Sequence, residues 1–392
     1  MDTIICGATA YRYWRTPPIV LYLAAAPVDS PALRRFARQD EILAFRSDLA
    51  ERLPFLKECS GPSWRNPGDC AKTIRDACWL LAPSAEFPID VLTQSRRHRR
   101  ASRLISPTLL QGDLPRRSTQ DITDELRVAS PAFAMLQLAA RSSLIRTVLL
   151  ASELCGTYAV YHAPSPIADE LQRLANRGRL GTFGGWRPCL DPDGRITDLW
   201  SREPLATPDD LLQMADEAAG KPGCATLRQA AELVIPNAAS PFETQAGILL
   251  GFSRRRGGEG FEGLTHNEKV ELSRDARLIA GRECCYCDLY WPCGLDVECQ
   301  SAQYHDSMEG LLSDSDRTAA LSLMGISVLP LTYDGLKDEK RFAAFSSAVA
   351  RALGVEQKPR TATQLKAMKR LRSEVFVPWA SLPGGNFVEC AP

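Results

Sequence analysis

The alternation of short strands and helices in the last third of the chain constrains the fold more than any other feature. Apolar periodicity, helix-start residues and turn residues predict seven elements there. They are a helix from Ser240-Pro241 to about 252, strands over 267–272, 284–290 and 295–299, a helix over 308–324, a strand over 326–331 and an amphipathic helix over 338–353. The order α-β-β-β-α-β-α predicts a mixed α/β unit of ordinary domain size.

The remaining chain is richer in helix signals. Serine or threonine followed by proline, as at Ser130-Pro131 and Thr207-Pro208, marks helix starts. We expect four parts, which are an α/β region over 1–125 with no derivable role, a helical middle region over 126–239, the mixed unit over 240–355 and a basic helical tail over 356–392. The predicted fold class is therefore α+β or mixed α/β, with an α-rich N-terminal region.

Composition excludes several classes of protein. The 392 residues carry 47 acidic and 47 basic side chains, which argues against a generally basic nucleic-acid coat protein but allows a local basic patch. The apolar stretch 19–27 is too short to span a bilayer, and no signal peptide is recognisable. Thirteen cysteines, an odd number, indicate free thiols in a reducing compartment. We expect a cytoplasmic protein with no membrane partner.

The hairpin formed by CDLYWP and LDVECQ holds the candidate catalytic residues. Because side chains alternate along a strand, Asp288 is expected to share a face with Tyr286 and Tyr290, and Glu298 to share one with Gln300. Two carboxylates on adjacent strands favour a hard cation between them, Mg²⁺ or Mn²⁺. Such an ion would acidify a bound water, which Gln300 could orient.

A less specific interpretation stays open, in which these are solvent-facing polar residues of an ordinary hairpin. The neighbouring residues favour a site: His305 follows the third strand, and Asp314 and Arg317 share a face of the next helix. Glu243 is a further candidate metal ligand, although a capping box with Ser240 explains it without a metal.

Five cysteines between 284 and 299 include the zinc-like spacing Cys284-x-x-Cys287. A zinc knuckle needs a turn, whereas this pair begins a predicted strand, and no second pair completes it. We therefore expect buried free thiols and no zinc.

Two arginine-rich segments are candidate DNA contacts. One contains Arg96, Arg97, Arg99 and Arg100, and the other contains Arg254, Arg255 and Arg256 beside two glycines. Either segment could instead be an exposed solvated loop. No phosphate-binding loop, dinucleotide fingerprint or serine-hydrolase elbow is present in the sequence.

These residues resemble the PD-(D/E)xK restriction-endonuclease-like superfamily, in its very-short-patch-repair-like branch, over about 240–354. The features shared with that branch are a strand aspartate (Asp288), an acidic residue on the next strand (Glu298), a histidine (His305), D-x-x-R on a helix (Asp314 and Arg317) and G-[IV]-x-V opening the last strand (325–328). The chain also resembles a group of actinobacterial proteins through ELCGTY (153–158) and DLYWP (288–292).

The resemblance implies an αβββαβ domain that cleaves DNA with Mg²⁺ or Mn²⁺. Asp288 and Glu298 would be metal ligands and Glu243 a further ligand. Arg317 could then neutralise phosphate charge, or simply pair with Asp314. Gln300 departs from the pattern, because the superfamily has lysine there and the actinobacterial group more often has aspartate.

Three hypotheses follow. The first is a metal-dependent DNA endonuclease in phage defence or a mobile element, in which Gln300 orients the water and His305 assists proton transfer. The second is an antitoxin-like DNA-binding regulator with a degenerate nuclease domain and a cognate toxin or defence-system partner, suggested by a faint N-terminal similarity to abortive-infection antitoxins. The third is an interaction protein that shows no salt-dependent DNA binding.

Overall fold

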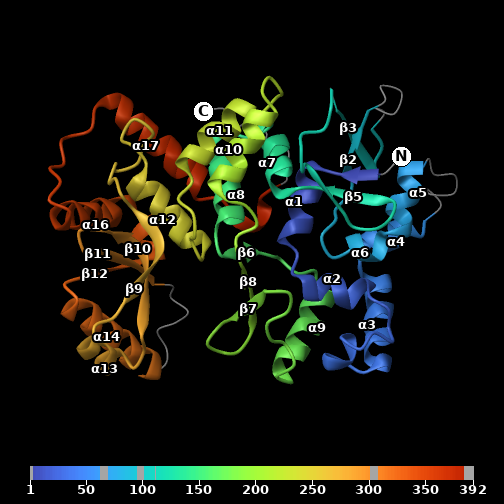
Figure 1. Cartoon of the computed structure of the whole chain (residues 1–392), viewed down its shortest axis with the longest axis horizontal. Coiled ribbons are helices and arrows are strands. Elements are labelled where there is room, and N and C mark those ends of the chain that lie inside the picture. The colour runs from blue at the N-terminus through green and yellow to red at the C-terminus, as the bar shows by residue number, and fades with distance from the viewer. Residues whose placement is uncertain (1–2, 62–68, 95–100, 111, 301–307, 384–392) are drawn as a thin grey trace.

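The computed structural model describes residues 3–61, 69–94, 101–110, 112–300 and 308–383 (Figure 1). Its described residues form a mixed α+β structure of seventeen α-helices and three β-sheets, which agrees with the predicted class at that level. Among the described helices, none has the length and apolar character needed to cross a membrane.

The helices of the first half are α1 (Gly7–Arg15), α2 (Pro18–Ala25), α3 (Gln39–Arg52), α4 (Pro54–Cys59), α5 (Asp69–Asp76), α6 (Cys78–Leu81), α7 (Pro131–Ala139), α8 (Leu144–Cys155) and α9 (Ser165–Asn176). Those of the second half are α10 (Pro208–Glu217), α11 (Cys224–Leu233), α12 (Pro241–Gly251), α13 (Arg274–Ala280), α14 (Met308–Leu323), α15 (Tyr333–Lys337), α16 (Glu339–Ala352) and α17 (Ala362–Val375).

The N-terminal region contains a five-stranded sheet, so its description as α-rich is incomplete. The sheet has the order β3-β2-β1-β5-β4, in which β1 is parallel to β5 and antiparallel to β2. Its strands are β1 (Thr3–Ile5), β2 (Ile89–Thr93), β3 (Ile105–Leu109), β4 (Thr119–Asp121) and β5 (Leu126–Ala129). Strands of three to five residues give too short an alternation to be recognised in a sequence.

The middle of the chain confirms the expected helix starts. The hydroxyls of Ser130 and Ser143 cap α7 and α8, and Thr207 forms a reciprocal capping box with Asp210 at α10. A three-stranded sheet of order β6-β8-β7 adjoins these helices, with β6 (Tyr158–Val160), β7 (Arg187–Leu190) and β8 (Ile196–Ser201).

Glu153, the first residue of ELCGTY, is a buried residue that bonds segments far apart in the sequence. Its carboxylate accepts hydrogen bonds from Arg15 Nε at 2.7 Å, Trp379 Nε1 at 2.5 Å and the backbone amide of Val160 at 3.0 Å. Arg202 donates to the Glu153 backbone carbonyl at 2.7 Å. Since Glu153 is 1% exposed, this motif has a structural role: it fixes a buried charge among N-terminal, middle and C-terminal segments.

The C-terminal sheet has the order β12-β11-β10-β9. Its strands are β9 (Thr265–Glu271), β10 (Cys284–Trp291), β11 (Leu295–Gln300) and β12 (Ser327–Thr332), close to the predicted ranges, and the short helices α13 and α15 are additional. Strands β9, β10 and β11 are antiparallel, whereas β12 runs parallel to β11. Because β12 is an edge strand, it tolerates Pro330, which lacks the amide proton that a central strand would need.

Two hydrophobic cores enclose this sheet. A small core formed with α13 and α14 contains Cys285, Cys287 and Leu321, and the main core of the molecule includes Leu289, Val297 and residues of α12. Figure 1 shows α13 and α14 at one end of the sheet and α12 between the sheet and the central helices. The buried cysteines pack as small apolar side chains, and every described cysteine is free of a disulfide, as expected.

Candidate active site and nucleic-acid surface

Asp288 lies at the point along β10 where the strand's buried side chains change from one hydrophobic core to the other. Cys287 packs into the small core while Leu289, two residues on, packs into the main core. Asn267, which the register places opposite Asp288, has a left-handed backbone with φ of 49°. Buried and less buried side chains alternate along the whole of β10, but the core that the buried residues contact changes at Asp288, beside a kink in β9 at the left-handed Asn267.

The regular pairing of β10 with β11 stops beside Asp288, whose carboxylate bonds the neighbouring strand. Regular pairing of the two strands covers 289–291 and 295–297, and the same register places Asp288 opposite Glu298. Asp288 Oδ2 accepts the backbone amide of Cys299 at 2.9 Å, a proton that a strand carbonyl would otherwise take. The two predicted acidic residues thus face each other across the point where the hairpin opens.

Glu298 has a basic partner within the protein. Arg317 of α14 donates to the Glu298 carboxylate and to the backbone carbonyl of Tyr286, and it lies 3.8 Å from Asp296 Oδ2. The side chains of Glu298 and Arg317 are 15% and 17% exposed, so solvent screens their attraction weakly. Arg317 therefore has Glu298 as a partner, while the side chain of Asp314 lies outside the described part, so its expected pairing with Arg317 stays a prediction, as does the contact of Arg317 with phosphate.

Glu243 combines helix capping with a place beside the strands. Its backbone amide donates to Ser240 Oγ at 3.1 Å, and its carboxylate accepts the Ala239 amide at 2.7 Å and the Ser240 hydroxyl at 2.9 Å. Asn267 Nδ2 at the kink donates to Glu243 Oε2 at 3.0 Å. Ser240 caps α12 as predicted, but the box is not reciprocal, because the Glu243 carboxylate accepts the Ala239 amide and not the Ser240 amide. The bond from Asn267 ties α12 to β9 at the same point.

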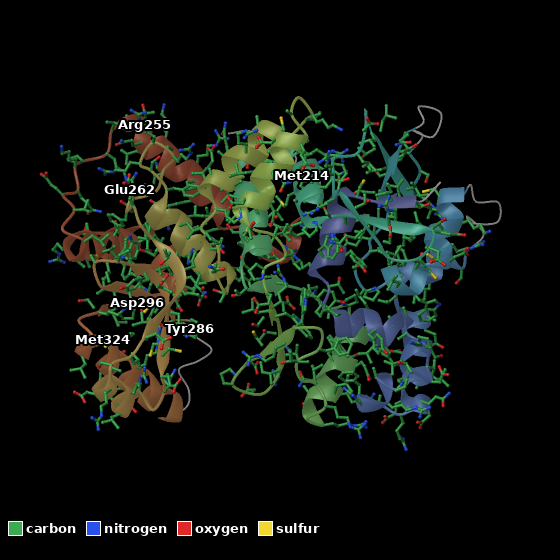
Figure 2. All side chains as sticks on the ribbon, viewed as in Figure 1. Met214, Arg255, Glu262, Tyr286, Asp296 and Met324 are labelled. Carbon is green, nitrogen blue, oxygen red and sulfur yellow. The ribbon has the colours of Figure 1, made fainter. Side chains whose placement is uncertain are left out.

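Asp296 is a member of the site that sequence reasoning missed. It occupies β11 two residues before Glu298 and is fully buried, although its acidic type favours solvent. The alternation that grouped Glu298 with Gln300 also places Asp296 on that face, so the signal was present in LDVECQ. We call Glu243, Asp288, Asp296 and Glu298 the acid cluster; Figure 2 labels Asp296 and, nearby, Tyr286.

Burial and mutual repulsion raise the pKa values in the acid cluster. Burial is the larger cause at Glu243, where the pKa rises to about 7, and at Asp296, where burial and Glu298 raise the pKa to about 9. The pKa of Asp288 is raised well above its usual range by burial and by the charges of Glu243 and Glu298. At neutral pH Asp296 is therefore protonated, and Glu243 is protonated in about half of the molecules.

His266 lies beneath Asp288 and is neutral. It is 4% exposed, its Nδ1 is 3.2 Å from the Asp288 backbone oxygen, and burial lowers its pKa to about 4. Gly247 of α12 leaves room for this ring, because a Cβ there would be 2.5 Å from His266 Nε2. A neutral imidazole thus supports the backbone that carries Asp288.

The donor chemistry of the acid cluster suits a hard divalent cation, since every ligand atom would be a carboxylate oxygen. In this arrangement each of Glu243, Asp288 and Glu298 already has a protein partner. Within the described residues, no group of three or more histidine, cysteine, aspartate or glutamate side chains is disposed to hold a metal ion. His305 lies outside the described residues, and Gln300 ends β11, half-buried and paired in register with Thr332.

The arginine triplet forms a turn against α17. Arg254 is half-buried, whereas Arg255 and Arg256 are exposed. Gly257 has φ of 99°, and a Cβ there would be 2.5 Å from the Ala367 carbonyl oxygen, so glycine permits the close approach. The segment before α17 is held to this turn by Arg360, which pairs with Glu259 at 2.8 Å.

This packing joins two basic segments that are a hundred residues apart in sequence. We call their exposed side chains the basic surface, which comprises Arg255, Arg256, Lys366, Lys369 and Arg370. Figure 2 shows Arg255 beside α17, at the end of the domain away from Asp296. The other candidate DNA contacts, Arg96, Arg97, Arg99 and Arg100, lie outside the described residues.

Comparison with known proteins adds no family assignment. No protein-family model, no curated protein and no solved structure matches this chain. The functional conclusions therefore rest on the residues themselves.

Proposed function

We propose that this protein is a metal-dependent DNA endonuclease of the PD-(D/E)xK type, which hydrolyses phosphodiester bonds at the acid cluster. The observation that carries the proposal is the facing pair Asp288 and Glu298 at the point where β10 and β11 separate. An α-helix before the strands brings a third carboxylate, Glu243, to the same place. The C-terminal elements follow the order α-β-α-β-β-α-β, which supports the proposal in so far as it is the implied αβββαβ order with the short helix α13 inserted between the first two strands.

In this proposal Asp288 and Glu298 hold a Mg²⁺ or Mn²⁺ ion, with Glu243 as a further ligand, and the ion when bound acidifies water and neutralises phosphate charge. The Cys299 amide orients Asp288, and the capping bonds of Ser240 and Ala239 orient Glu243. Arg317, released from Glu298, offers its guanidinium to a phosphate oxygen.

Cleavage of supercoiled plasmid by the full chain with Mg²⁺ or Mn²⁺ tests the proposal. We expect nicking that is lost in Asp288→Ala and in Glu298→Ala and is retained in Asp275→Asn, a matched change of an acidic residue on α13. Nicking that survives both cluster variants, or that is equal without divalent cations, would refute the assignment.

A DNA-binding regulator with an inactive nuclease domain is the second candidate. The observation that favours it is the Glu298–Arg317 pair, which gives the key carboxylate an internal cation. DNA would then be bound by the basic surface, and the acid cluster would be structural.

Salt-dependent DNA binding separates the two candidates. For the regulator we expect no cleavage, a preference for an operator sequence, and normal binding by Asp288→Ala. In either case Arg255→Gln combined with Arg256→Gln should reduce the slope of log affinity against log salt by about 2, one for each lost phosphate contact. An unchanged slope would exclude the basic surface as the DNA contact, and an absence of salt-dependent binding would favour an interaction protein.

A further inference from the structure

A cavity of about 1270 Å³ lies beside the N-terminal sheet, and residues 219–222, Leu382 and Pro383 also line it. None of its lining residues belongs to the acid cluster. The strands β2 and β3, with Cys6 at the start of α1, form its floor, and α1, α7 and α8 contribute its walls. Ligand pockets usually measure roughly 300–1,000 Å³, so this space accommodates a sizeable organic molecule.

The floor of the cavity is polar, which is unusual for a sheet face covered by helices. In the register of the three strands, Asp90 lies beside Ser106 and Leu92 beside Thr108, and the Cys6 amide donates to the Asp90 carbonyl at 2.9 Å. Residues of the opposite parity, Ile5, Ile89 and Val91, pack into the main core. One face of this sheet is therefore built for packing, and the other presents thiol, hydroxyl and carboxyl groups.

Hydrogen bonds hold these polar groups in place. Asp90 Oδ2 accepts the Ala8 amide at 3.2 Å, and Asp90 N donates an amide proton to Thr9 Oγ1 at 3.0 Å. Gly7, with φ of 53°, brings the start of α1 against Asp90, since a Cβ there would be 3.3 Å from Asp90 Oδ2. The floor is thus preorganised, which lowers the entropy cost of binding.

The walls add positive charge and apolar surface. Four basic side chains line the cavity, Arg12, Arg141, Arg146 and Lys221, against two acidic ones, Glu86 and Asp90. Arg141 reaches the floor and donates to Thr108 Oγ1 at 3.3 Å. The aromatic rings of Phe87 and Phe133 line the same space. A ligand that complements these walls has anionic groups, hydroxyl or amino groups and an apolar planar part.

We propose that this cavity binds a nucleotide. Arg12 is paired with Glu86 at 2.9 Å and Lys221 donates to the Asp113 carbonyl at 2.6 Å, so Arg141 and Arg146 are the side chains that contact the phosphate. The Asp90 carboxylate and the floor hydroxyls bond the sugar hydroxyls or a base amino group, and Phe87, which is half-buried, contacts the base. This site is independent of the proposed nuclease function, because none of its residues belongs to the acid cluster or the basic surface.

Calorimetric titration of the full chain with AMP, ATP, NAD⁺ and inorganic phosphate, in EDTA, tests this inference. We expect at least one nucleotide to bind more tightly than phosphate, and Arg141→Gln to weaken that binding at least tenfold, the loss of about one charge-assisted bond. Arg351→Gln, on the exposed side of α16, is the matched control and should bind normally, as should Asp288→Ala.

Asp90→Asn, which keeps an acceptor for the Ala8 amide, is a second variant in case Arg141→Gln folds poorly. We expect Asp90→Asn to change the order of affinity among the nucleotides. The inference fails if no nucleotide binds more tightly than phosphate, if both cavity variants bind like the unchanged protein, or if Asp288→Ala abolishes the binding.

Discussion

Replacing Glu243 with glutamine removes a buried carboxyl group while keeping its shape and its hydrogen-bond acceptor. In the unchanged protein, burial raises the pKa of Glu243 from 4.5 to about 7. The folded state therefore binds this proton more tightly than the unfolded state does, and its contribution to stability is complete below pH 4.5 and is lost as the pH rises through 7. Each pH unit is worth about 1.4 kcal/mol, so the loss is about 3 kcal/mol.

Denaturant unfolding of both proteins between pH 4 and pH 8, in EDTA to exclude divalent cations, measures this effect. The difference in unfolding free energy between Glu243→Gln and the unchanged protein should shift by about 3 kcal/mol in favour of the variant across that range. Glu268→Gln, an exposed change on β9, is the control and should show no such pH-dependent difference. Parallel stability curves for Glu243→Gln and the unchanged protein would refute the assignment of a buried, protonated Glu243.

Two further predictions concern close packing at Gly247 and the buried ion pair of Arg15 with Glu153. Gly247→Ala places a Cβ 2.5 Å from His266 Nε2, so we expect a destabilisation of about 1–3 kcal/mol in thermal unfolding, and an unchanged Tm would contradict the close approach of α12 to β9. Arg15→Met leaves the Glu153 carboxylate buried without its cation, which should cost about 3–5 kcal/mol in unfolding free energy. Arg12→Met, on the same helix but more exposed, is its control, and equal losses for the two variants would show that the buried charge is not the cause.

Local structure is predictable from sequence wherever a short-range signal specifies it. Serine at 130, 143 and 240 satisfies free amides at the first turn of a helix, and the structure has a helix at each position. The hairpin 284–300 was equally legible, because apolar residues alternate with polar ones along both strands. Capping and alternation signals depend only on residues a few positions apart, so they can be recognised in the sequence without knowledge of the fold.

The acid cluster was predictable in part. Asp288, Glu298 and Glu243 were identified from residue type, spacing and resemblance, whereas Asp296 was passed over although the same alternation places it on the face of Glu298. Helical spacing predicts only that Asp314 and Arg317 share a face, whereas the structure also pairs Arg317 with Glu298, on a strand nineteen residues away in sequence. An ion pair between a helix and a strand depends on how the two elements pack, which cannot be read from residue spacing along the helix.

Tertiary structure alone decided the remaining features. The kink beside Asp288 depends on the left-handed Asn267 of the neighbouring strand. The cysteines of one sheet pack into two different cores. The Glu153 carboxylate accepts hydrogen bonds from residues 15, 160 and 379. The floor of the N-terminal cavity likewise combines residues 6, 90, 106 and 108. Such features arise because many side chains are buried together when the whole chain folds, and a short stretch of sequence does not show which distant residues will meet.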